Sequence, residues 1–275
     1  MARHTRRAVL GSLAAVGLEG CTGRLGGDAE QTTETTERTL SAVPETLSVT
    51  NDVGPVSVTG EDRSDVQIEL TCRGDPDRIE RLAFSVQRDG SSVSLAGETD
   101  NDGLIQNDSG LSLSIAVRLP TSVAVERVET TVGDVTLTGV GGDPTVASTA
   151  SELTVRSVDG FVSAETTTGD VTVRDVGGLD SVEATTGDLA LDVPSLRSDS
   201  SITTTAGDVE LAVAPDLDAT VSVSADAGDV TVSGLPLTRT EQTTGTTASG
   251  TLGGGDDRLD VETDVGTVEL RPLSE

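Results

Sequence analysis

One short phrase returns along much of the chain and constrains the fold more than any other feature. It reads VETTVGDVTLTGVGG from Val128, AETTTGDVTVRDVGG from Ala164 and VEATTGDLALDV from Val182. We use the aspartates of its Gly-Asp pairs as markers. They lie 36, 18, 20 and 21 residues apart, and the first spacing is twice 18. The marker aspartates are Asp134, Asp170, Asp188, Asp208 and Asp229. The chain is therefore built largely from units of 18–21 residues.

The degenerate copies obey the same pattern. Ser151-Glu152 fills the midpoint of the long gap, and Gly266-Thr267 closes the series. The first and third positions after every marker are aliphatic: Val135/Leu137, Leu153/Val155, Val171/Val173, Leu189/Leu191, Val209/Leu211, Val230/Val232 and Val268/Leu270. Apolar residues at every second position are typical of half-buried strands.

The length of the repeat predicts how these strands are arranged. A unit of 18–21 residues is too short for a four-stranded propeller blade and suits one coil of a solenoid. We expect each coil to stack on the preceding one in parallel, with a right-handed crossover. The predicted fold is all-β, a right-handed parallel β-solenoid (β-helix) over residues 40–275 that begins with β-rich N-terminal coils. One short helix is expected at 75–82, capped by Asp75 with Pro76 in its first turn.

The marker aspartates have two interpretations. A glycine suits a tight corner, and the aspartate beside it can accept a hydrogen bond from a nearby backbone N–H. Stacked aspartates could also form a calcium ladder, but the calcium-binding nonapeptide repeat is not present. We favour turn capping with weak, non-specific binding of calcium or monovalent cations at these positions. No specific metal site and no cofactor are predicted.

The N-terminus predicts export. Residues 1–20 carry basic residues followed by a mildly apolar run too short to span a bilayer, as in a signal peptide. Arg6 and Arg7 resemble the twin-arginine export signal. Leu18 to Cys21 resemble a lipobox with Glu19 at an unusual position, so Cys21 is the predicted lipidation site. The alternative is a plain secreted protein with an incidental cysteine. Residues 21–39 are rich in Thr, Glu and Gly and are expected to form a flexible tether.

Composition excludes several classes of function. The net charge is −29, lysine is absent, and the only histidine is His4 in the signal segment. This acidic composition resembles the proteins of extreme halophiles, whose surface carboxylates stay hydrated in molar salt. Nucleic acid is an improbable partner for so acidic a chain. Without a histidine in the mature chain, Ser-His-Asp and Cys-His catalysis are excluded. A two-carboxylate glycosidase stays chemically feasible, but there are almost no aromatic residues to stack on sugars.

Three smaller features carry weaker predictions. Asn107-Asp108-Ser109 is a possible N-glycosylation site. Cys72 is expected to be an unpaired, semi-buried strand residue. The threonine runs 166–168 and 203–205 resemble ice-ordering ladders, but we interpret them as outward-facing strand positions.

A family resemblance rests on two segments. Leu111–Gly142 contains an amphipathic strand ending in Leu119-Pro120, followed by a T-x-G-D-V-x-L coil, and Ser249–Leu270 closes the series. Both segments resemble the putative-adhesin β-strand-repeat family, a domain of unknown function numbered 4097. The likeness covers roughly residues 40–271. It implies a right-handed β-solenoid on secreted or envelope-anchored proteins, with adhesion as the suggested role and no catalytic residues. Ser151-Glu152 and Gly266-Thr267 depart from the motif of the family.

Together these features predict a non-catalytic adhesion or structural module. It would be exported and lipid-anchored at the cell surface, with the membrane and an unidentified surface or extracellular partner as its contacts. The alternatives are an envelope-associated module that binds a ligand or senses stress and, more remotely, an enzyme acting on polysaccharides.

Overall fold

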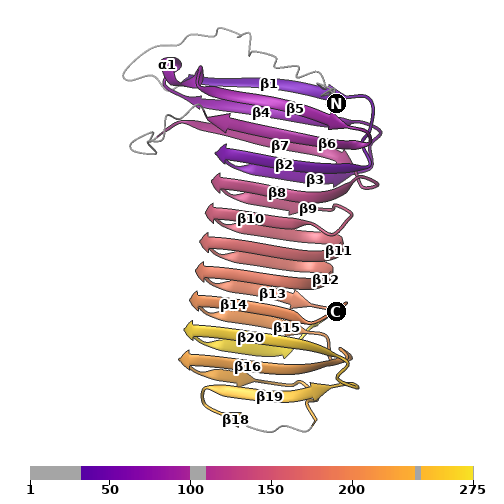
Figure 1. Cartoon of the computed structure of the whole chain (residues 1–275), viewed down its shortest axis with the longest axis vertical. Coiled ribbons are helices and arrows are strands. Elements are labelled where there is room, and N and C mark those ends of the chain that lie inside the picture. The colour runs from indigo at the N-terminus through magenta and orange to yellow at the C-terminus, as the bar shows by residue number, and fades with distance from the viewer. Residues whose placement is uncertain (1–31, 100–109, 239–242, 275) are drawn as a thin grey trace, which may run out of the picture.

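The computed structural model describes residues 32–99, 110–238 and 243–274. In this part of the chain nearly every element is a strand, and the strands stack into one elongated body (Figure 1). They form a single 21-stranded sheet of mixed orientation that curls around one aliphatic core. The prediction of an all-β chain is confirmed.

Two ladders of paired strands make up the sheet. In stacking order, ladder A contains β5 (Leu82–Asp89), β6 (Ser92–Thr99), β2 (Thr46–Val53), β8 (Ala124–Val132), β10 (Thr145–Ala150), β11 (Leu153–Thr168), β12 (Val171–Thr186), β14 (Ser200–Ala206), β20 (Asp257–Val265), β16 (Ala219–Ala227), β19 (Thr247–Leu252) and β18 (Thr243–Thr244). Ladder B contains β1 (Thr32–Leu40), β4 (Val66–Gly74), β7 (Ser112–Pro120), β3 (Val56–Glu61), β9 (Val135–Thr138), β11, β12, β13 (Leu189–Val193), β15 (Val209–Val213), β21 (Val268–Pro272) and β17 (Val230–Val232).

The two ladders are continuous because β11 and β12 belong to both. Each bends at a non-glycine residue with positive φ, Ser157 at 54° and Asp175 at 53°. The first half of each strand lies in ladder B and the second half in ladder A. One chain segment therefore crosses from one ladder to the other.

The repeat accounts for the middle of the stack. Leu153 pairs with Val171, which pairs with Leu189, so neighbouring strands are parallel and offset by one unit of 18 residues. The predicted aliphatic positions are buried, except Val232, which is partly buried against the core. Burial of these side chains supplies most of the favourable free energy of a fold of this kind.

The stacking order differs from the prediction at both ends. The coil formed by β20 and β21 comes last in the sequence, yet it lies between β14/β15 and β16/β17. Likewise, β2 and β3 lie between β6/β7 and β8/β9. Coils therefore do not always stack on the preceding coil. The outermost pairings are antiparallel at both ends of ladder A and at the β1 end of ladder B, so the predicted wholly parallel stack is wrong there. At the other end of ladder B, β17 still pairs parallel with β21.

The predicted tether is also corrected in part. Residues 32–39 belong to β1, which pairs with β4 over its full length, and residues 21–31 lie outside the described part. The residues of β1 alternate between half-buried and exposed, which is the two-residue period of a strand. This part of the segment is therefore a paired strand and not a flexible linker.

A helix forms where it was predicted but is shorter, and Cys72 is more deeply buried than predicted. The helix α1 (Pro76–Ile79) begins after Asp75, whose carboxylate accepts a hydrogen bond from Asp77 N–H, but Leu82 already starts β5. Cys72 is unpaired and buried, and burial, followed by the nearby charge of Glu34, raises the pKa of its thiol. In the part of the chain that the structure describes, no helix is long and apolar enough to cross a membrane.

Candidate functional site

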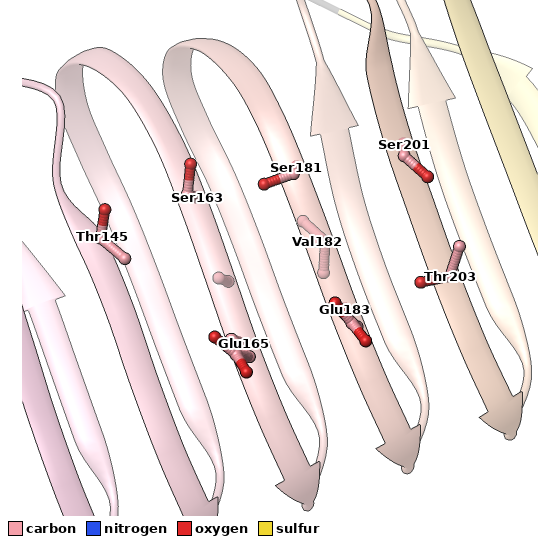
Figure 2. A pocket seen from close by; sticks show the side chains of 9 residues that line it. Thr145, Ser163, Glu165, Ser181, Val182, Glu183, Ser201 and Thr203 are labelled. Carbon is pink, nitrogen blue, oxygen red and sulfur yellow. The ribbon is translucent and has the colours of Figure 1, made fainter.

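A shallow groove of about 310 Å³ lies on the outer side of ladder A (Figure 2). It crosses β10, β11, β12 and β14, so it runs along the stack rather than along a strand. Its lining residues are Thr145, Ser163, Ala164, Glu165, Ser181, Val182, Glu183, Ser201 and Thr203. The groove is thus built by four successive repeats.

Two rows of polar side chains flank the groove. Thr145, Ser163, Ser181 and Ser201 are paired in register and form a row of hydroxyls, which we call the hydroxyl row. Two residues further along the strands, Glu165 and Glu183 form the carboxylate row, which Thr203 continues with a hydroxyl. Members of a row are about 4.8 Å apart because that is the spacing of paired strands. The buried Ala164 and Val182 lie between the rows.

The side chains of the two rows are free to bind an external group. Among the described residues, none of these hydroxyls or carboxylates makes a hydrogen bond or ion pair with another part of the chain. Two carboxylates beyond the groove have an arginine partner. Glu129 lies 2.9 Å from Arg127, and Asp260 lies 2.6 Å from Arg258. Glu165 and Glu183 are adjacent carboxylates without such a partner, so this stretch favours groups that donate hydrogen bonds or carry positive charge.

The marker aspartates lie at a corner of the stack, where each links two coils. Asp170 Oδ1 accepts a hydrogen bond from Asp188 N–H at 2.9 Å, and Asp188 Oδ1 accepts one from Asp208 N–H at 2.8 Å. Asp134 Oδ1 does the same with Glu152 N–H at 3.3 Å. We predicted that these carboxylates accept a hydrogen bond from a nearby backbone N–H. The N–H groups that they contact belong to the next coil, because the stacking brings them within reach.

The marker residues of successive coils form a column along this corner. The last members of the column are Asp208, Thr267 and Asp229. Thr267 donates to Asp208 Oδ1 from its N–H at 2.8 Å and its hydroxyl at 2.7 Å. These two hydrogen bonds, the backbone one first, lower the pKa of Asp208. Asp229 follows Thr267, and its carbonyl accepts a hydrogen bond from Val268 N–H at 2.9 Å. The inserted coil therefore separates Asp208 from Asp229.

Most corners have a glycine because the coils approach closely there, and Ser151 takes the corresponding place in one coil. A Cβ on Gly187 would lie 2.1 Å from the carbonyl oxygen of Gly169, and one on Gly207 would lie 2.0 Å from that of Gly187. Both contacts are far inside van der Waals distance. The two residues of the Gly-Asp pair thus have different roles. The glycine allows neighbouring coils to approach closely, and the aspartate accepts a hydrogen bond from the neighbouring coil.

The carboxylates of this column are spaced along the stack and are not clustered at one point. Among the residues that the structure describes, no three carboxylate, thiol or imidazole side chains converge as metal ligands. The aspartates are spread over successive coils. In four of them one carboxylate oxygen already accepts a hydrogen bond from a backbone N–H, namely Asp134, Asp170, Asp188 and Asp208. Weak cation binding at these positions stays a prediction.

A buried polar row inside the same corner was missed by the sequence analysis. It consists of residues at one register position, interrupted by Ala184 between Thr166 and Thr204: Asn51, Thr130, Ser148, Thr166, Thr204 and Thr263. Asn51 Nδ2 donates to the carbonyl oxygens of Gly54 and Leu113, both at 2.8 Å, and Thr263 Oγ1 donates to Gly207 O at 3.2 Å. The prediction that the threonine runs face outward is therefore wrong for Thr166 and Thr204.

An arginine cluster on another side of the stack was also missed. Arg197 donates to Asp143 at 2.5 Å and to Asp180 at 2.9 Å, and its guanidinium lies 4.6 Å from the ring centroid of Phe161. Phe161 N–H, followed by Arg197, lowers the pKa of Asp143. One side chain thus connects three coils. Sequence spacing carries no signal for it, because its partners are 17 to 54 residues away.

Four predicted residues cannot be placed. Arg6, Arg7, Cys21 and Asn107 lie outside the described residues. Export, lipidation and glycosylation at these positions stay predictions.

Comparison with protein families decides the classification. The model of the family described as Toastrack DUF4097 matches residues 29–271. The chain belongs to the Toastrack family. The resemblance drawn from Leu111–Gly142 and Ser249–Leu270 is confirmed. No curated protein matches this Toastrack chain.

Several solved structures are similar to this Toastrack chain over most of its length. A putative cell adhesion protein from Clostridium sporogenes has 11% identity and a TM-score of 0.35, covering 88% of this chain and 99% of its own. A putative adhesin from Parabacteroides distasonis has 12% identity and a TM-score of 0.41, covering 89% and 98%. A putative lipid binding protein from the same organism has 12% identity and a TM-score of 0.38, covering 87% and 96%. Likeness at this level carries no argument about function.

Proposed function

We propose that this Toastrack protein is a non-catalytic adhesion or structural module. It is exported through the signal at Arg6 and Arg7, anchored by lipid at Cys21, and displayed at the cell surface. Its coils form a right-handed solenoid whose outer side binds a surface or extracellular partner. The groove in ladder A carries this proposal, because it repeats the same hydroxyl and carboxylate groups at regular spacing.

A repeated groove favours attachment over catalysis. A catalytic site needs different groups converging on one reacting atom, whereas the hydroxyl and carboxylate rows offer similar groups along a line. Many weak polar contacts along one line add up when the partner is itself a repeating surface. Binding of this kind is graded and depends on salt, because exposed charges are screened.

The test is surface attachment of cells that lack the gene. We expect attachment to fall on deletion, to return with the wild-type gene, and to stay low with Cys21→Ser. A groove variant, Ser163→Arg with Ser181→Arg, should also fail to restore attachment, since two long cationic side chains fill the groove and pair with its carboxylates.

The matched control is Thr154→Arg with Thr172→Arg. These residues lie on the same two strands and face outward in ladder B, so the control adds the same charge outside the groove. Attachment should return with this control. If attachment is unchanged by deletion, the adhesion proposal is wrong and envelope sensing becomes the better hypothesis. Equal loss in both double variants would place the binding surface elsewhere.

A further inference from the structure

The strand β1 is an open edge at one end of the stack (Figure 1). It pairs with β4 from Thr32 to Leu40, and no other strand in the described residues pairs with it. The strand is nine residues long, contains no proline and has no bulge in its register with β4. A long regular edge of this kind presents unpaired backbone groups to any strand that fits.

The sequence of β1, TTETTERTL, is complementary to itself. In an antiparallel pair of two β1 strands centred on Thr36, Glu34 of each copy lies opposite Arg38 of the other. If the two strands are instead centred on Thr35 or Glu37, both Glu34 and Arg38 lie opposite an uncharged residue, either threonine or leucine. Of these three registers, only the one centred on Thr36 produces two equivalent Glu–Arg pairs, and directly opposed opposite charges stabilise a strand pair.

The positions of the side chains agree with this register. Glu34 and Arg38 pair with the buried Cys72 and Ile68 of β4, so both project on the core side of ladder B. Both are half-buried, and neither makes an ion pair within the described residues, although Arg38 lies 5.6 Å from the ring centroid of Phe84. Glu34 and Arg38 are therefore two partly desolvated, opposite charges at the end of the core, and neither has an ionic partner.

We propose that the partner of β1 is a second copy of this chain. The two β1 strands pair antiparallel about a two-fold axis at Thr36, so that ladder B continues from one molecule into the next. The interface is isologous, because Glu34 contacts Arg38 of the partner and Arg38 contacts its Glu34. This inference does not depend on what the groove in ladder A binds.

The first test is cross-linking in the full chain carrying Cys21→Ser, with Cys72 left buried. Thr36→Cys should form an intermolecular disulfide on mild oxidation, since a residue on the axis faces its own copy at about 4.5–5.5 Å between Cα atoms. Thr35→Cys and Glu37→Cys alone should not cross-link, but a mixture of the two should. Cross-linking that favours any other position, or none, would overturn the proposed register.

The second test uses charge reversal and sedimentation. Glu34→Arg or Arg38→Glu alone should raise the dimer dissociation constant about tenfold, because each creates two like-charge pairs. The double variant Glu34→Arg/Arg38→Glu restores both pairs with exchanged signs, so its dissociation constant should return close to that of the parent. A parent chain that stays monomeric at high concentration, or a double variant weaker than either single variant, contradicts the proposal.

Discussion

At the scale of single residues, the corner glycines make the sharpest prediction. Gly187 has φ near +146°, and a Cβ there would lie 2.1 Å from the carbonyl oxygen of Gly169. Gly90 also has positive φ, +61°, but no atom lies within 4 Å of its would-be Cβ. The two positions therefore separate the cost of backbone conformation from the cost of a close approach.

We expect Gly90→Ala to lower the free energy of unfolding by about 1–2 kcal/mol, which is the cost of a left-handed conformation. Gly187→Ala should cost more than about 3 kcal/mol, because the coils must also move apart. Chemical denaturation of both variants measures the difference. Equal losses would mean that the stack widens easily at its corner, contrary to the tight packing described above.

Residue patterns in the sequence predict the aliphatic core well, but they predict the buried polar row that contains Thr166 poorly. The two-residue period places Val171 and Val173 inside, and both are fully buried. The same period, continued from the buried Val162 and Ala164, also places Thr166 inside. We assigned Thr166 to the surface because threonine is polar. The decisive signal was its position in the strand. The buried hydroxyl of Thr166 has no hydrogen-bond partner among the described residues, whereas Thr263 in the same row donates to Gly207 O of a neighbouring coil.

At the scale of elements, the inserted last coil has a consequence for truncation. β20 and β21 pair with β14 and β15 on one side and with β16 and β17 on the other. A chain that ends at residue 256 therefore loses a coil from within the stack. We expect 200–252 to lose protection from hydrogen exchange, because the core on both sides of the gap meets water.

A control chain that ends at Leu273 keeps β21 and should keep the protection of the intact protein. In a solenoid stacked in sequence order, truncation at 256 would disturb only the end of the stack. Protection of β16 that survives this truncation would therefore show that β16 repacks directly on β14.

The sequence could not predict the order of the coils. Every copy of the repeat offers the same aliphatic pair and the same corner, so the coil at Val268 fits on Val209 or Val230 equally well by pattern. The choice depends on the hairpin β18–β19, which turns the chain back along β16 before β20 begins. Such a return is encoded in long-range pairing and not in local spacing.

At the scale of the whole molecule, a net charge of −29 makes stability depend on salt. The structure separates two kinds of stacked carboxylates. Asp170 and Asp188 each accept a backbone N–H, whereas Glu165 and Glu183 pair in register without any such donor. Charges at the strand spacing of about 4.8 Å repel by about 0.9 kcal/mol in water before screening. The repulsion between Glu165 and Glu183 is not offset by hydrogen bonds from backbone N–H groups.

We therefore expect Glu165→Gln with Glu183→Gln to raise the free energy of unfolding in low salt by about 0.5–1 kcal/mol. In molar salt the gain should vanish, because the Debye length falls to about 3 Å. Asp170→Asn with Asp188→Asn removes the same number of charges but weakens two charge-assisted hydrogen bonds, so it should give no gain at either salt concentration. Denaturation of both variants across a salt series measures this. An equal low-salt gain in the aspartate variant would show that the N–H groups of the next coil do not compensate the charges they contact.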